Sequence, residues 1–225
     1  MHQSIREFVK MVAETLPVPE PIFEFGSLLV PGQKDIADLR PFFPGKEYVG
    51  CDIREGPGVD RILDLHNITV PSESVGSVLM FDTLEHVEFP RRALEEVFRI
   101  LRPNGMVVMS SVMDFPIHNY PHDYWRFTPE AFKSLLGAFS HVFVDFAGEA
   151  AFPHTIVGLG FRGTTPVPLD TFTRQFEKWK RRWRDRYGKT WGPIVRLFAP
   201  PILLHLYRRI RGPVIRLLER VGIVR

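Results

Sequence analysis

The sequence predicts an α/β fold in which helices flank a doubly wound, mostly parallel sheet, followed by a basic, largely helical C-terminal extension. Seven short strand-like apolar runs alternate with segments of helical periodicity. The chain has 225 residues and is 44% hydrophobic, which is enough for a packed core. Charge divides the chain, because residues 1–169 carry a net −8 and residues 170–225 a net +11. We therefore predict a domain over 1–163 and the extension over 164–225.

The first part of the chain should supply one long helix and three strands. Apolar positions recur at helical spacing in residues 5–15, so we predict a helix over 4–15 that ends at the proline-rich stretch LPVPEPI. The strands expected next cover residues 22–25, 47–52 and 61–63, and a brief helix over 34–39 lies between the first two.

The second part should complete the sheet. A strand over 77–81 leads to a strongly periodic helix over 90–101, which the stop signal Pro103-Asn104-Gly105 follows. The remaining expected elements are a buried central strand over 106–112, a helix with Thr128 as N-cap and Pro129 at its first position, and strands over 141–146 and 155–161. In such sheets ligands bind at the carboxyl ends of the strands, so function is expected in the loops there.

Polar groups and a glycine follow the first three strands in an order that suits a nucleotide. Glu24 and Gly26 end the first strand, where a glycine lets a ligand approach the backbone closely. Asp52 ends the second strand, where a carboxylate can accept both hydroxyls of a ribose. Asp64 and Leu65 follow the third strand, where an adenine ring could lie, although a capped turn without a ligand explains them equally well.

The run FDTLEHVEFPRRALEEVFRILRPNGMVVMSSV resembles the class I S-adenosylmethionine-dependent methyltransferases, and the resemblance extends over about residues 20–162. It implies a Rossmann-like seven-stranded fold, an enzyme, and S-adenosylmethionine as the cofactor. The residues that it implies for the cofactor are Glu24 and Gly26 at the methionine end, Asp52 at the ribose, Asp64 and Leu65 at the adenine, and Phe81 and Asp82 beside the sulfonium. Ser27 and Ile53 are implied as further cofactor-binding residues.

The loop after the first strand departs from the family pattern. The family has G-x-G-x-G after the acid, whereas this chain has FEFGSLLVPG, with Gly26 in place and Gly32 arriving late. We expect a longer loop, bearing Leu28, Leu29 and Val30, to pass under the cofactor and Pro31-Gly32 to turn into a helix. The alternative is a non-catalytic adaptor protein whose altered loop no longer accepts the cofactor.

The stretch HNYPHDYWRF, residues 118–127, is dense in groups that transfer protons, stack or pair with anions. It is similar to a H/D-Y-W-R-F-T-P segment of bacterial methyltransferases that act on glycans and surface polysaccharides, which implies a hydroxyl of a sugar or glycolipid-like acceptor. The implied roles are proton acceptor for His122 or Asp123, with His118 in reserve, and acceptor binding for Tyr124, Trp125 and Arg126.

Structural roles compete for the same stretch. Trp125 can pack against the start of the following helix, and Arg126 can pair with Asp123 as a clamp. His86, in LEHV, fits a histidine that hydrogen-bonds the backbone better than one that acts in catalysis.

The sequence disfavours disulfides, a metal site, a membrane-spanning helix and secretion. Cys51 is the single cysteine, so no internal disulfide forms and a cytoplasmic setting is expected. Without a cysteine cluster or H-E-x-x-H spacing the sequence predicts no metal site, and the nearest grouping of His118, His122 and Asp123 lies on one loop. No apolar run reaches the length of about 18 residues that a spanning helix needs, and the N-terminus lacks the apolar core of a secretion signal.

The basic extension should bind a partner of its own. Residues 170–225 mix short apolar clusters with arginine and tryptophan, as in segments that lie at an anionic membrane surface, which would place the protein peripherally at the inner face of the membrane. Nucleic acid competes for the same charge and would favour a nucleic-acid methyltransferase. A third possibility is that the apolar face packs against the domain or a second subunit.

Overall fold

We describe a computed structural model over residues 3–30, 32, 34–118, 121–163 and 169–184. The described residues belong to one compact unit, Met1–Arg186, and a second unit, Tyr187–Arg225, lies outside them. Most of the expected basic extension, from residue 185 onward, is therefore outside the described residues, as is Pro31 of the loop after the first strand.

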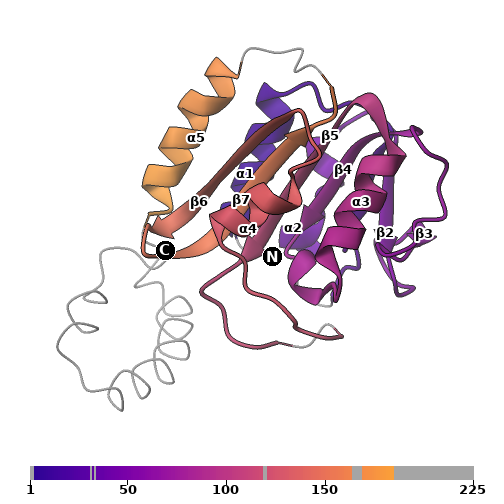
Figure 1. The fold of residues 1–225 in the computed structure, drawn as a ribbon, viewed down its shortest axis with the longest axis horizontal. Coiled ribbons are helices and arrows are strands. Elements are labelled where there is room, and N and C mark those ends of the chain that lie inside the picture. Colours follow the sequence, from indigo (N-terminus) through magenta and orange to yellow (C-terminus); the bar gives the residue numbers. More distant parts are fainter. Residues whose placement is uncertain (1–2, 31, 33, 119–120, 164–168, 185–225) are drawn as a thin grey trace. The chain divides into compact units, whose positions relative to one another are not determined.

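Seven strands form one sheet in the order β3-β2-β1-β4-β5-β7-β6 (Figure 1). Strands β1 to β5 pair in parallel, and β7 pairs antiparallel with both β5 and β6. The predicted doubly wound, mostly parallel sheet is confirmed, and its order reverses between β1 and β4. The strands span β1 Ile22–Phe25, β2 Tyr48–Asp52, β3 Arg61–Ile62, β4 Val75–Phe81, β5 Leu101–Val112, β6 His141–Glu149 and β7 Phe152–Phe161.

Helices cover both faces of the sheet and give the domain two hydrophobic clusters. On one face α3 and α4 pack on the sheet through Leu94, Val97 and Phe132. On the other, α1 and α5 contribute Phe8 and Phe176. Burial on both faces explains why β1 and β4 are apolar at nearly every position rather than alternating. The helices span α1 Gln3–Thr15, α2 Lys34–Ala37, α3 Pro90–Ile100, α4 Pro129–Leu135 and α5 Asp170–Arg182, with short 3₁₀ helices η1 Arg40–Phe42 and η2 Leu84–His86.

The sequence Pro103-Asn104-Gly105, which we predicted as the stop signal of α3, lies within strand β5 and not in a separate turn. Strand β5 begins at Leu101, directly after α3, and its pairing with β4 shifts register between Val75–Leu101 and Ser77–Met106. Pro103 and Asn104 fall in this irregularity and are exposed. The proline has no N–H to donate, so it is accommodated where the ladder is interrupted.

The compact unit continues past the boundary that we expected at residue 163, because α5 packs against α1. Its buried side chains Phe172, Phe176 and Trp179 join the second cluster, and the Trp179 indole N–H donates to the Ser4 carbonyl at 2.8 Å. The first part of the predicted basic extension is thus a core element of the domain.

Candidate functional site

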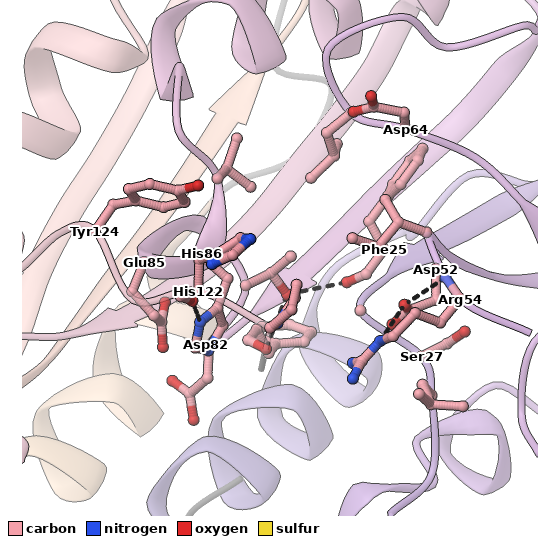
Figure 2. A pocket seen from close by; sticks show the side chains of 18 of the residues that line it. Phe25, Ser27, Asp52, Arg54, Asp64, Asp82, Glu85, His86, His122 and Tyr124 are labelled. Atoms are coloured by element: carbon pink, nitrogen blue, oxygen red, sulfur yellow. Dashed lines mark hydrogen bonds and ion pairs between the residues drawn. The ribbon is translucent and has the colours of Figure 1, made fainter. Parts of the chain in front are cut away.

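A cavity of about 820 Å³ opens at the carboxyl ends of β1, β2 and β4. This is where the strand order reverses, and in open α/β sheets ligands bind in the crevice at that point. The volume lies in the range of about 300–1,000 Å³ that small-molecule sites occupy. Figure 2 shows Ser27, Asp52 and Arg54 on one side of this cavity and Asp82, Glu85, His86 and His122 on the other.

Gly26 brings the end of β1 close to the loop after β4. Its φ of +85° lies in the left-handed region, and a Cβ atom there would stand 2.5 Å from the Thr83 hydroxyl oxygen. That hydroxyl donates to the Phe25 carbonyl at 3.1 Å and so ties the two loops together. Because a side chain at position 26 would fill the crevice, the open backbone satisfies the main requirement of a nucleotide at this turn.

The glycine-poor remainder of the loop forms an apolar wall. Leu28 and Val30 line the cavity, whereas the Leu29 side chain packs against Gly58. The Leu29 N–H donates to the Pro57 carbonyl at 2.8 Å, which anchors the loop on the segment after β2. Of the three residues expected to pass under the cofactor, Leu28 and Val30 thus line the cavity, whereas Leu29 is turned aside.

Asp52 ends β2 with a buried carboxylate that lines the cavity. Its Oδ1 atom accepts hydrogen bonds from the Arg54 backbone N–H at 3.0 Å and Nε at 3.3 Å. No other described residue bonds to this carboxylate, so Oδ2 can accept from a ligand. A hydrogen-bond-accepting carboxylate beside an open-backbone glycine fits the ribose and methionine parts of S-adenosylmethionine.

The residues predicted to contact the adenine, Asp64 and Leu65, also line the cavity, as does Ile53. The Asp64 Oδ1 atom accepts from the His66 backbone N–H at 2.8 Å and lies 2.8 Å from His66 Nδ1. This is the capped turn that the sequence allowed as an alternative role for Asp64. Asp64 forms this turn and also lines the cavity.

Glu24, in contrast, does not line the cavity. It is buried within β1 and accepts a hydrogen bond from the Tyr48 hydroxyl at 2.7 Å. Burial raises the pKa of Glu24 to about 7. Strand alternation turns neighbouring residues to opposite faces, so it is Phe25 that reaches the cavity.

The loop after β4 presents acidic groups to the cavity. Phe81 and Asp82 line it as expected, and Asp82 adopts a φ of +49°. Sequence reasoning missed Glu85, which also lines the cavity and is fully buried. Its Oε2 accepts from the Ser111 hydroxyl at 2.7 Å, and Oε1 has no hydrogen-bond partner among the described residues. Burial, followed by the nearby Asp82 carboxylate, raises the pKa of Glu85 to about 8.

The signal that would have identified Glu85 is its acidic side chain directly between the buried Leu84 and His86 in a short 3₁₀ turn. His86 bonds the His122 carbonyl oxygen through Nδ1, as predicted for a histidine that fixes the loop. Burial lowers the pKa of His86, which favours the neutral imidazole.

The stretch after β5 divides into cavity-lining and structural residues. His118, His122 and Tyr124 line the cavity, whereas Asp123, Trp125 and Arg126 do not. The Asp123 side chain is only 2% exposed, and its two oxygens accept from Arg126 at 2.5 and 2.7 Å. Arg126 holds the pKa of Asp123 well below its usual range. A buried, paired carboxylate of low basicity does not fit the base role expected for Asp123.

Arg126 and Trp125 likewise have structural partners. The Arg126 guanidinium also donates to the Phe115 carbonyl at 3.2 Å and the Pro116 carbonyl at 3.0 Å, which makes it a clamp for the loop. The Trp125 indole N–H donates to the Val87 carbonyl at 3.0 Å. Asp123, Trp125 and Arg126 therefore have structural roles. The expected contact of Trp125 and Arg126 with the acceptor is not supported, because neither residue lines the cavity.

Comparisons with known proteins agree with this cavity. Residues 39–109 match the family described as a methyltransferase domain, Methyltransf_11. A SAM dependent methyltransferase from Archaeoglobus fulgidus has a TM-score of 0.53 at 16% identity, over 69% of this chain and 94% of its own. The Burkholderia thailandensis 1,6-didemethyltoxoflavin-N1-methyltransferase, with bound 1,6-didemethyltoxoflavin and S-adenosylhomocysteine, scores 0.54 at 16% identity over 72% and 79%. No curated protein matches the chain.

These likenesses establish a Rossmann-like methyltransferase fold. The matched family segment contains Asp52, Asp64, Asp82 and Glu85, which line one cavity. Together the family match and the fold support a methyltransferase domain in this chain. Within the described part of the chain no helix combines the length and apolar character needed to cross a bilayer.

Proposed function

We propose that this protein transfers a methyl group from S-adenosylmethionine to a hydroxyl of a sugar or glycolipid-like acceptor. The observation that carries the proposal is the shared cavity, in which Asp52 and the open backbone at Gly26 face a histidine-bearing wall formed by the segment after β5. One side is suited to hold a nucleoside, and the other can accept a proton.

The cofactor half would be held by residues at the ends of three strands. Asp52 accepts the ribose hydroxyls through its carboxylate, and Gly26 gives the methionine part close access to the backbone. Leu28 and Leu65, which line the cavity, would supply apolar contacts to the nucleoside. When bound, S-adenosylmethionine supplies a methyl carbon that the sulfonium makes electrophilic.

The acceptor half must align a hydroxyl and remove its proton. His122 is the proposed base, because it lines the cavity and an imidazole accepts protons near neutral pH. Tyr124, 43% exposed at the cavity rim, offers an aromatic face on which a sugar ring can stack, and its ring lies 5.7 Å from that of His122. Asp123 contributes by positioning the loop through Arg126 and the His118 backbone N–H, at 2.8 Å.

The experiment that tests the cofactor half is calorimetric titration with S-adenosylhomocysteine. We expect micromolar binding by the wild-type protein, on the order of −8 kcal/mol. Asp52→Ala should abolish it, because the ribose hydroxyls lose their acceptor. Glu55→Ala is the matched control, since this exposed acid lies three residues further along and outside the cavity lining.

Unchanged affinity in a folded Asp52→Ala protein would remove the central assignment. No binding by the folded wild-type protein would favour the alternative, a non-catalytic protein of methyltransferase fold. If binding is found, radiolabelled methyl transfer to a panel of glycans, glycolipids and RNA identifies the acceptor class, and labelling of RNA alone would favour a nucleic-acid methyltransferase.

A further inference from the structure

We propose that Glu85, His86 and His118 form a binding site for a divalent transition-metal ion in the acceptor half of the cavity. Each residue offers one ligand atom, and the three atoms lie within 4.8 Å of one another. All three residues line the cavity, so an ion can enter from solvent. The ligands come from two segments, η2 and the loop after β5, which explains why a search for one short spacing motif predicted no metal.

The carboxylate of Glu85 provides the first argument. Glu85 is fully buried, yet its Oε1 atom bonds to none of the described residues. Buried polar atoms almost always have a partner, because an unsatisfied one has lost its bonds to water and gained none in return. A cation in the adjoining cavity would bond this oxygen and would offset the repulsion between Glu85 and the nearby Asp82 carboxylate.

The orientation of the two imidazoles provides the second. His86 Nδ1 bonds the His122 carbonyl oxygen, and His118 Nδ1 lies 3.3 Å from Asp123 Oδ2 and 3.2 Å from the Pro116 carbonyl oxygen. Carbonyl and carboxylate oxygens only accept hydrogen bonds, so both Nδ1 atoms donate, and in the neutral imidazole this tautomer leaves the lone pair on Nε2. A metal-binding histidine is held in this way by an acceptor behind it.

The Asp123–Arg126 clamp gains a role in this arrangement. Arg126 keeps Asp123 in place with two hydrogen bonds, and Asp123 in turn orients His118. A carboxylate behind a histidine also strengthens the histidine as a ligand. Asp123 is thus a positioning residue, which is consistent with its burial and with its absence from the cavity lining.

The donor set selects the class of ion. Two imidazole nitrogens and one carboxylate oxygen suit Zn²⁺, Mn²⁺, Fe²⁺ or Co²⁺, whereas Ca²⁺ and Mg²⁺ prefer oxygen ligands throughout. Two histidines and one carboxylate leave further coordination positions open. An ion at this site would lower the pKa of an acceptor hydroxyl bound to it, and His122 would then remove the proton more easily. This last role rests on the proposed function, but ion binding itself does not.

Titration of the full-length, chelator-treated protein with Co²⁺, followed by visible absorption and by equilibrium dialysis, tests the site. We expect one Co²⁺ per chain, displaced by Zn²⁺. Glu85→Gln and His118→Gln should each weaken Co²⁺ binding by at least the ~10–100-fold that loss of an outer-shell partner causes. His141→Gln, an exposed histidine on β6 outside the cavity lining, is the matched control and should bind as the wild type does.

The absence of stoichiometric Co²⁺ binding by the wild-type protein would overturn the proposal, as would wild-type affinity in folded Glu85→Gln and His118→Gln variants. Circular dichroism establishes that each variant is folded. S-adenosylhomocysteine titration of the same samples separates the two proposals, because metal binding without nucleoside binding would remove only the proposed function. Nucleoside binding without metal binding would remove only the metal site.

Discussion

Gly26 combines two requirements in one residue. Its left-handed φ disfavours any side chain, and the space that a Cβ atom would occupy is already taken by Thr83, at 2.5 Å. Gly45 has a similar φ of +75°, but a Cβ atom there would have no neighbour within 4 Å. A comparison of alanine substitutions at the two positions therefore separates the free-energy cost of the left-handed backbone from the cost of the clash with Thr83.

We expect Gly26→Ala to lower the free energy of unfolding by more than Gly45→Ala, which should cost only about 1–2 kcal/mol for the left-handed conformation. Gly26→Ala should also abolish binding of S-adenosylhomocysteine, because the added methyl group displaces the Thr83 loop from the crevice. Urea unfolding and calorimetry measure the two effects. Equal stability losses together with unchanged nucleoside binding would show that the crevice at Gly26 is not a ligand site.

At the scale of elements, α5 shows how a charged sequence can contribute to a core. Its basic side chains Arg174, Lys178 and Arg181 are exposed, whereas Phe172 and Phe176 are buried against α1. The Phe176 ring contacts those of Phe8 and Phe143, with centroids 6.2 and 4.9 Å apart. The helix therefore covers the sheet with one face and leaves the other positive.

Phe176→Ala should lower the free energy of unfolding by about 3–5 kcal/mol, the usual cost of removing a buried phenylalanine ring. Glu177→Ala, at the neighbouring exposed position of the same helix, should change it by no more than about 0.5 kcal/mol. Denaturant unfolding of the full-length protein gives both values. A Phe176→Ala protein as stable as the wild type would mean that α5 is not docked on α1 in solution.

At the scale of the whole molecule, the basic segment outside the compact unit begins later than the sequence first indicated. Helix α5 belongs to the compact unit that ends at Arg186, and residues 187–225 still carry a net +7. Each basic residue near an anionic bilayer contributes about 1 kcal/mol, so this segment alone carries enough charge for the membrane contact that the sequence predicts.

We expect a chain that ends after Arg186 to lose binding to phosphatidylglycerol-containing vesicles while it keeps S-adenosylhomocysteine binding, because the cavity lies wholly within residues 25–124. Vesicle sedimentation measures the first property and calorimetry the second. Full-length protein with neutral phosphatidylcholine vesicles is the control. Equal sedimentation of the shortened and full-length chains would exclude the membrane role of residues 187–225.

The sequence alone determined the sheet and half of the site. Apolar periodicity and the residues that cap or end each element are local properties, so they predicted all seven strands and the helices between them. Because the carboxyl ends of parallel strands meet at one edge, placing Gly26, Asp52 and Asp64 after their strands was enough to bring them to one cavity.

Only the tertiary structure decided which side chains meet across loops. Whether Asp123 faces the acceptor or Arg126, whether Glu24 reaches the cavity, and whether α5 docks on the sheet depend on contacts between distant segments, which periodicity does not encode. The same holds for Glu85, His86 and His118, since the last two lie 32 positions apart in the sequence and folding brings their ring centroids to 4.8 Å. Long-range packing sets such meetings, because it fixes the loop conformation that local preferences leave open.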